Sequence, residues 1–151
     1  MNITELLSEN RMRLELEGTT KEEIIDELIA LLERSGALKD AASYREAVMA
    51  REQESSTGIG FGIAIPHGKT HSVASPAVAF GRKLPGIDWD SIDTEDATLF
   101  FMLAVPEDGG SEHLKILQNL SRKLVDDEFR LALEQAPDKA AIAALVAQIQ
   151  S

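Results

Sequence analysis

The sequence predicts an α/β fold, in which a single small mixed β-sheet is flanked by helices on both faces. Short apolar segments of strand length are interspersed with longer segments whose apolar residues recur at helical spacing. The continuous apolar run 98–105 is typical of a central strand that is covered on both faces. Strands and helices in this order indicate layers, with the sheet between the helices.

The first expected elements are a strand and two helices. Apolar and charged residues alternate over residues 12–17, which is the period of a half-buried strand. Thr20 followed by Glu23 is a capping-box pattern. The apolar residues after it repeat at helical spacing up to Gly36, a residue that favours the end of a helix. A second helix is expected over residues 40–53.

The middle of the chain predicts a loop and further strands. Residues 55–62 are small, polar and rich in glycine, so a loop is expected there. Residues 63–65 form a short strand candidate that Pro66 interrupts, and residues 77–83 form another. Leu84-Pro85-Gly86 is typical of a turn, which would precede the central strand.

Three helices are expected after the central strand. Ser111 can cap the first, and Asp126 can cap a second that ends at about Gln135. Pro137-Asp138 is expected to start the third. The residues expected to face inward are Leu114, Leu117, Leu120 and Leu124 in the first helix and Ile142, Leu145, Val146 and Ile149 in the last.

The composition is that of one globular domain. The chain has 151 residues, of which 44% are hydrophobic and 27% are charged, and a core of that size is stable without cross-links. No repeat, linker or low-complexity tract divides the sequence, so residues 1–151 are expected to form a single domain. The sequence has no cysteine, which excludes disulfides, thiolate metal sites and cysteine nucleophiles.

The charge and the termini restrict the partners. Fifteen basic and 26 acidic residues give a net charge of −11, which would repel nucleic acid and favour encounter with a basic-faced protein. The N-terminus lacks the cationic start and apolar run of a signal peptide. The longest strongly apolar stretch, residues 99–105, is too short to cross a bilayer. We therefore expect a soluble, cytoplasmic protein without membrane insertion and without nucleic acid as a partner.

His67 is the first candidate for chemistry. It follows Pro66 and precedes Gly68 at the end of an apolar triplet, so we expect it at a strand-to-loop junction, exposed on one side. A neutral imidazole nitrogen is a competent nucleophile near neutral pH. Gly68 would let the backbone come close to a bound group. From spacing alone, an inert loop histidine is the more common explanation.

His113 and Arg51 are candidates for binding a phosphoryl group. His113 falls in the first turn of a predicted helix, where a neutral imidazole can donate a hydrogen bond to a phosphoryl oxygen. Arg51 presents a planar fork that suits phosphate oxygens. Each has an ordinary alternative: a surface histidine for His113, and an arginine paired with Glu52 or Glu54 for Arg51.

Metal and nucleotide binding are not expected. His71 lies four residues after His67, but the local sequence offers neither an aligning helix nor a third ligand. The glycines of residues 58–62 precede a predicted strand, whereas a dinucleotide fingerprint precedes a helix. Gly68-Lys69-Thr70 lacks the upstream glycine of a phosphate-binding loop.

Together these elements resemble enzyme IIA of the fructose/mannitol class in the bacterial sugar phosphotransferase system. The resemblance covers essentially the whole chain. The segments that carry it are Arg51-Glu52, Ser56-Thr57-Gly58-Ile59-Gly60, Gly62-Ile63-Ala64-Ile65-Pro66-His67-Gly68, Gly86-Ile87-Asp88-Trp89, Val105-Pro106-Glu107 and Glu112-His113-Leu114. The block around His67 is specific enough to outweigh the inert-histidine explanation.

The resemblance implies a phosphoryl carrier. His67 would accept a phosphoryl group through its Nε2 atom from a histidine of the phosphocarrier protein HPr. It would then pass the group to a cysteine of an enzyme IIB on a separate chain. His113 would stabilise the phosphoryl oxygens and Arg51 would offset their charge, so neither a metal nor a cofactor is expected.

Further residues take roles from the same resemblance. Ser56, Thr57 and Gly68 are expected to contact the phosphoryl group. Phe61 stands where mannitol-type members tend to carry glutamate, which indicates a fructose-type member. We expect Phe61 to form an apolar docking rim for partner proteins.

Three functions stay open from the sequence. The first is a phosphoryl carrier that serves the uptake of a fructose-like sugar. The second is a regulatory relative, similar to the nitrogen-related enzyme IIA, that signals by phosphorylation-dependent partner binding. The third is a non-catalytic binding module with a vestigial site. The joint presence of Arg51, His67 and His113 disfavours the third, because a decayed site should have lost one of them.

Overall fold

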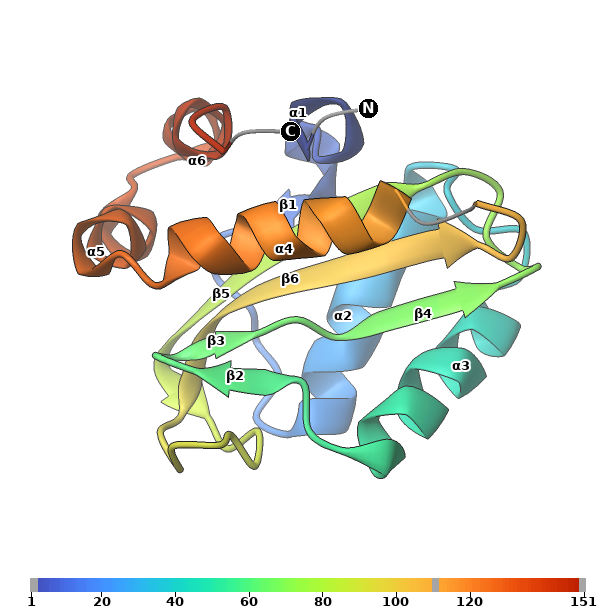
Figure 1. The fold of residues 1–151 in the computed structure, drawn as a ribbon, viewed down its shortest axis with the longest axis horizontal. Helices are drawn as coiled ribbons and strands as arrows, with labels where there is room; N and C mark the ends of the chain where they lie inside the picture. Colours follow the sequence, from blue (N-terminus) through green and yellow to red (C-terminus); the bar gives the residue numbers. More distant parts are fainter. Residues whose placement is uncertain (1–2, 110–111, 150–151) are drawn as a thin grey trace.

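The computed structural model describes residues 3–109 and 112–149, apart from the side chains of residues 112 and 113. Its helices are α1 (Ile3–Leu6), α2 (Lys21–Arg34), α3 (Ala41–Glu54), α4 (Glu112–Leu124), α5 (Asp127–Gln135) and α6 (Lys139–Val146), with a short 3₁₀ turn at Glu9–Arg11. Its strands are β1 (Met12–Arg13), β2 (Gly58–Gly60), β3 (Ile63–Ala64), β4 (His67–Thr70), β5 (Ala77–Ile87) and β6 (Ala97–Pro106). The strands form one sheet between two layers of helices (Figure 1).

Strand β6 is the centre of the sheet, as its apolar sequence predicts. The strand order is β1-β5-β6-β3-β2, and β4 pairs with the same edge of β6 as β3 does. Because β5 is antiparallel to β6 whereas β3 and β4 are parallel to it, the sheet is mixed. The predicted α/β class with a single mixed sheet is confirmed.

Alternate residues of β6 serve two separate cores. Phe101 and Leu103 face the layer of α1, α4, α5 and α6, whereas Phe100 and Met102 face α2 and α3. All four of these side chains are buried. Successive side chains of a strand point to opposite faces, so an unbroken apolar run requires helices on both sides. The prediction of helices on both faces is therefore confirmed.

Local capping chemistry sets the starts of the helices. The side chain of Thr20 accepts a hydrogen bond from the Glu23 N–H at 3.2 Å at the start of α2, and Asp40 does the same for α3. Asp126 and Asp138 cap α5 and α6 in the same way. These four caps satisfy backbone donors that a helix leaves unpaired, and all four starts match the sequence prediction. Ser111 lies outside the described residues.

Two strand predictions need correction. The strand expected over residues 12–17 is in register with β5 only at Met12 and Arg13. Beyond them the Arg82 side chain donates to the Leu14 carbonyl at 3.1 Å, and the Leu16 N–H donates to the Arg82 carbonyl at 2.9 Å. The expected loop 55–62 contains strand β2, which pairs antiparallel with β3. A side chain at Gly58 would collide with Ser91, so this glycine lets the backbone of β2 lie close to Ser91. From composition alone, the same glycine suggests a loop.

Two further predictions fail for geometric reasons. Leu84-Pro85-Gly86 is not a turn but an irregular part of β5: Arg82 pairs with Leu99 and Ile87 with Ala97, so the segment between them bulges out of the ladder. Leu114 is 51% exposed. It lies six residues before the buried Leu120, and about 100° of rotation per residue places it away from the core-facing side of α4. The apolar face of α4 consists of Ile116, Leu120 and Leu124, with Leu117 packed against it.

Candidate functional site

His67 is the first residue of β4, immediately after the break that Pro66 makes between β3 and β4. It pairs with Leu103 of β6 and is half-buried. Proline lacks a backbone N–H, but its carbonyl can still accept a hydrogen bond. The Leu103 N–H donates to the Pro66 carbonyl at 3.0 Å, so the hydrogen bonds between this segment and β6 continue past the proline. The expectation that the chain becomes a loop at His67 is therefore wrong. The histidine is held by a strand that pairs with the centre of the sheet.

The His67 ring has a defined orientation. Its Nδ1 atom lies 2.9 Å from the carbonyl oxygen of Ile65. A carbonyl oxygen only accepts hydrogen bonds, so Nδ1 must carry the proton in this contact. In the neutral ring the lone pair is then on Nε2. The contact thus leaves Nε2 as the ring nitrogen with the lone pair.

Helix α3 lies across β4 at this point. A Cβ atom at Gly68 would lie 3.1 Å from Cε1 of Tyr44 and 3.1 Å from Cγ2 of Val48. Glycine therefore favours this close approach, because a larger residue would require the Tyr44 and Val48 side chains to shift. The structure gives Gly68 a packing role, and its contact with a bound phosphoryl group stays a prediction.

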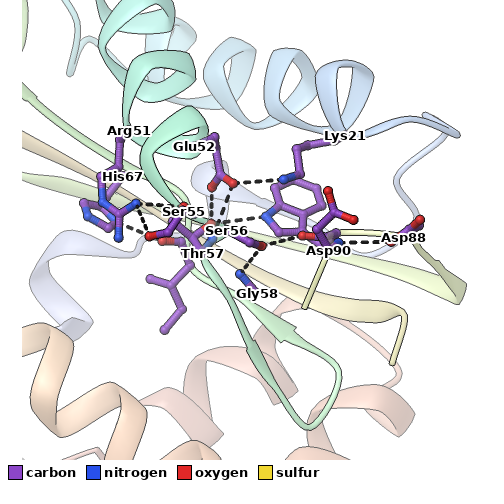
Figure 2. Close-up of polar contacts among 12 residues, drawn as sticks. Lys21, Arg51, Glu52, Ser55, Ser56, Thr57, Gly58, His67, Asp88 and Asp90 are labelled. Carbon is purple, nitrogen blue, oxygen red and sulfur yellow. Dashed lines mark hydrogen bonds and ion pairs between the residues drawn. The ribbon is translucent and has the colours of Figure 1, made fainter. Parts of the chain in front are cut away.

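Arg51 lies one turn beyond Ala47, which also faces Gly68. Its Nη1 atom donates to the Ser55 carbonyl at 2.9 Å and lies 3.4 Å from Ser55 Oγ. Figure 2 shows the Arg51 guanidinium and the His67 ring at the same side of the set of residues that it draws. The alternative that Arg51 pairs with Glu52 or Glu54 does not hold among the described residues: Glu52 pairs with Lys21, and the Arg51 guanidinium bonds to Ser55 instead of to Glu54.

Ser56 and Thr57 are engaged within the protein. The Ser56 hydroxyl donates to the Trp89 carbonyl and accepts from the Gly58 N–H at 3.0 Å. The buried Thr57 hydroxyl donates to Glu52 and accepts from Trp89 Nε1 at 3.1 Å. Their predicted contacts with a phosphoryl group stay predictions, and in this structure both hydroxyls fix the loop before β2.

Sequence reasoning missed the cluster that surrounds Thr57. The side chain of Glu52 is 3% exposed and forms an ion pair with Lys21 Nζ at 3.1 Å. Lys21 Nζ also lies 5.1 Å from the centre of the Trp89 ring. The two partners of the ion pair are 31 residues apart, and no local pattern links them.

Phe61 lies away from His67, at the turn between β2 and β3. Its backbone has a φ of 60°, its N–H donates to Asp93 Oδ2 at 2.9 Å, and the Arg130 guanidinium covers its ring at 4.8 Å. The hydrogen bond from this N–H lowers the pKa of Asp93 from its usual value. Gly62, next to Phe61, bonds to Thr98 of β6, whereas His67 pairs with Leu103 of the same strand. The five residues from Thr98 to Leu103 span about 16 Å, so Phe61 and His67 lie about that far apart along β6. The docking role of the 55% exposed Phe61 stays a prediction.

The structure does not place the side chain of either other histidine, His71 or His113, beside His67. His113 is in the first turn of α4, but its side chain lies outside the described part of the chain. His71 is exposed and lines a hollow of about 430 Å³ with Lys39 and Pro106. Among the described residues, no three His, Asp or Glu side chains gather as metal ligands would, and no helix has the length and apolarity to span a membrane.

Tyr44 holds α3 to the strand that pairs with His67, and its removal gives a testable pH dependence. Its buried hydroxyl donates to the Leu103 carbonyl at 2.6 Å, and burial raises the pKa of Tyr44 above its ordinary value. Tyr44→Phe is expected to lower the free energy of unfolding by about 1–3 kcal/mol at neutral pH, because the carbonyl loses its donor.

The same raised pKa sets the sign of the pH effect. Above about pH 10 the unfolded phenol loses a proton that the folded one retains, so wild-type stability falls as pH rises. Tyr44→Phe lacks this contribution. Urea unfolding at several alkaline pH values should therefore show the stability gap between the two proteins narrowing; a gap that stays constant above pH 10 would contradict the burial of this hydroxyl.

The chain matches the family described as "Phosphoenolpyruvate-dependent sugar phosphotransferase system, EIIA 2" over residues 5–149. It is 45% identical over 148 residues to the PTS system fructose-specific EIIABC component of Bacillus subtilis (strain 168), covering 98% of this chain and 23% of that protein. The chain therefore spans about a quarter of this relative. It is 42% identical over 136 residues to the fructose-specific EIIA component of Haloferax volcanii, covering 90% of this chain and 88% of that one.

Solved structures have the same fold. Nitrogen regulatory protein IIA-Ntr from Neisseria meningitidis superposes with a TM-score of 0.89 at 33% identity, covering 95% of this chain and 98% of that one. Enzyme IIAMtl in its complex with phosphorylated enzyme IIBMtl from Escherichia coli gives a TM-score of 0.82 at 23% identity, covering 95% and 99%. The second likeness bears on the fold alone.

Proposed function

Because this chain belongs to the EIIA 2 family of the phosphoenolpyruvate-dependent sugar phosphotransferase system, we propose that it carries a phosphoryl group on Nε2 of His67. Nε2 attacks the phosphorus of a phosphohistidine on HPr, and the bond from phosphorus to the HPr nitrogen breaks. A cysteine thiolate of enzyme IIB then attacks the same phosphorus, and the bond to Nε2 breaks. The Nδ1 proton stays in place throughout both steps.

The observation that supports this proposal most directly is the Nδ1 contact with Ile65 at 2.9 Å. Transfer between two protein nucleophiles needs an in-line approach, so the nitrogen lone pair must have a fixed direction. A ring anchored through Nδ1 to the main chain meets that requirement. His67 is also half-buried rather than enclosed, which leaves access for a partner protein.

Charge compensation is assigned to Arg51 and His113. The transferring phosphoryl group spreads negative charge over three oxygens, and positioned donors stabilise that charge. Arg51 is held at the end of α3 by its hydrogen bonds to Ser55. His113 belongs to the first turn of α4, where the positive end of the helix favours anions. No metal or other cofactor is needed for this chemistry.

His113→Ala is expected to leave phosphoryl acceptance in place and to slow it by roughly 10²-fold, because a donor is lost while the nucleophile remains. The measurement is rapid-quench transfer from phospho-HPr at saturating concentration. Lys115→Ala, on the exposed side of the same helix, is the control and should transfer at the wild-type rate. A wild-type rate for His113→Ala would remove His113 from the site.

We further propose a role in the uptake of a fructose-like sugar, with enzyme IIB on a separate chain. The support is the identity of 45% and 42% to fructose-specific relatives. The separate chain is favoured by the Haloferax volcanii relative, which is named as an EIIA component and is covered to 88%, whereas the name of the B. subtilis relative joins the A, B and C components. We also propose that residues 1–151 act as one domain in the cytoplasm, with phosphorylated HPr as donor.

A regulatory role is the second candidate. It is favoured by the similarity to IIA-Ntr of N. meningitidis, at 33% identity and a TM-score of 0.89. The two functions share the phosphorylated histidine and differ in the fate of its phosphoryl group. A carrier transfers the group to enzyme IIB, whereas a regulator retains it and binds a partner according to its phosphorylation. A binding module with a vestigial site would not be phosphorylated.

The deciding experiment is intact-mass spectrometry after incubation with phosphoenolpyruvate, enzyme I and HPr, under conditions that preserve acid-labile adducts. We expect a gain of one phosphoryl group that requires HPr. Adding a fructose-class enzyme IIB should then remove it from this chain. A stable adduct that no IIB removes would support the regulatory role, and no adduct would support the vestigial site.

A further inference from the structure

Glu52 is a buried carboxylate next to the candidate site, and the proposed transfer chemistry does not use it. Its side chain, 3% exposed, accepts hydrogen bonds from three donors: Lys21 Nζ at 3.1 Å, the Thr57 hydroxyl and the Thr57 N–H at 3.4 Å. Trp89 Nε1 donates to the same Thr57 hydroxyl at 3.1 Å. Figure 2 shows Lys21 from α2 and Thr57 on either side of the Glu52 carboxylate, which comes from α3.

The contacts continue from Thr57 to the His67 ring. The Thr57 carbonyl accepts a hydrogen bond from the Ile65 N–H at 3.0 Å. The Ile65 carbonyl in turn faces His67 Nδ1 at 2.9 Å. Ile65 is therefore held on its N–H side by Thr57 and uses its carbonyl to orient the histidine. A shift of Thr57 would move the acceptor that sets the tautomer of His67.

We propose that Glu52 is a positioning residue for His67: by fixing Thr57 it aims the Ile65 carbonyl at Nδ1 and so keeps the reactive lone pair on Nε2. The inference rests on the proposed function of His67 as phosphoryl acceptor. Glu52 acts through two other residues and touches neither the ring nor the phosphoryl group.

The chemistry of the cluster favours positioning over simple packing. Taking an ion pair out of water is costly, and apolar residues of similar volume often stabilise a protein as well or better. A charged acceptor, however, forms shorter and stronger hydrogen bonds than a neutral one. Because both the hydroxyl and the N–H of Thr57 end on the Glu52 carboxylate, the carboxylate fixes the residue in orientation as well as in place. Such support is what a reactive side chain needs to keep a productive geometry.

Glu52→Gln tests the carboxylate with almost no change in volume. Glutamine offers one oxygen and one NH₂ group, so it cannot accept from Lys21 and from both Thr57 donors. If the amide oxygen stays toward Lys21, the Thr57 hydroxyl faces the NH₂ group, must accept from it as well as from Trp89, and loses the acceptor of its own proton. In the opposite orientation the NH₂ group faces two donors, Lys21 Nζ and the Thr57 N–H. Glu54→Gln is the matched control, because Glu54 ends the same helix and is exposed.

Thr57→Val is the second variant. It removes the hydroxyl that links Glu52 to Trp89 and retains the Thr57 N–H. Thr57→Ser restores the hydroxyl and should restore the wild-type behaviour. This conservative rescue separates the hydrogen bond from the packing of the methyl group, and it keeps the proposal testable if Glu52→Gln does not fold.

The first measurement is the ¹⁵N chemical shifts of the His67 ring in the unphosphorylated proteins. Wild type and Glu54→Gln should show the neutral tautomer with the proton on Nδ1, and Glu52→Gln and Thr57→Val should show a mixture of both tautomers. The second is acceptance from phospho-HPr, where kcat should fall by roughly ten- to hundredfold. KM for phospho-HPr should stay unchanged, because Glu52 and Thr57 are buried and their substitution changes no exposed side chain.

The two proposals fail in distinguishable ways. If folded Glu52→Gln and Thr57→Val keep a single tautomer and the wild-type kcat, the positioning role of Glu52 is wrong. If kcat falls but the tautomer does not change, the proposed route through Ile65 is wrong. If wild type accepts no phosphoryl group at all, the proposed function fails, while the ring shifts still decide whether Glu52 positions His67.

Discussion

Replacing His67 with alanine is expected to abolish phosphoryl acceptance completely. Alanine offers no nucleophile, and in the structure it is His67 whose ring is anchored at Nδ1 with the lone pair on Nε2. His71→Ala is the matched control: it removes an exposed histidine four residues further along the chain and should leave acceptance unchanged. Intact-mass spectrometry with phosphoenolpyruvate, enzyme I and HPr measures both.

Loss of function in His67→Ala should not reflect loss of the fold. The substitution removes one hydrogen bond to the Ile65 carbonyl, which costs about 1 kcal/mol. For a chain of this length, that corresponds to a fall in Tm of roughly 2–4 °C. An adduct that persists in a folded His67→Ala protein would place the acceptor at His71 or His113 and would overturn the assignment.

The largest loss of stability is expected from Trp89→Ala. Trp89 is fully buried, its ring lies 5.1 Å from that of Phe100, and its Nε1 donates to Thr57. Truncating a buried tryptophan leaves a cavity and costs about 3–5 kcal/mol. Because a domain is stable by about 5–15 kcal/mol in total, urea denaturation should show a much lower midpoint with the same slope.

Trp89→Phe separates packing from hydrogen bonding. Phenylalanine keeps most of the ring contact with Phe100 and lacks the N–H that reaches Thr57, so the expected cost is about 1–2 kcal/mol. Trp89 is the chain's single tryptophan, so unfolding of these variants must be followed by circular dichroism rather than by tryptophan fluorescence. A cost below about 1 kcal/mol for Trp89→Ala would show that the segment after β5 is not part of the core.

Much of the fold could be predicted because its signals are local in sequence. A cap depends on a side chain and a backbone N–H two or three residues away, as at Thr20, Asp40, Asp126 and Asp138. An unbroken apolar run requires two covered faces wherever it lies, which identified β6 as the central strand. The motif around His67 is contiguous too, so the candidate nucleophile was found without knowledge of the fold.

The sequence by itself determined the layers, the helix starts and the candidate histidine. Only the tertiary structure decided what orients that histidine. Thr57 is fixed by Glu52 and Trp89, and Glu52 is paired with Lys21. Within the expected loop 55–62, residues 58–60 form strand β2 because β3 lies beside them. These partners come from separate segments of the chain. Their hydrogen bonds exist only once the sheet and its helices have brought those segments together. No local propensity or residue spacing predicts which of these side chains will meet.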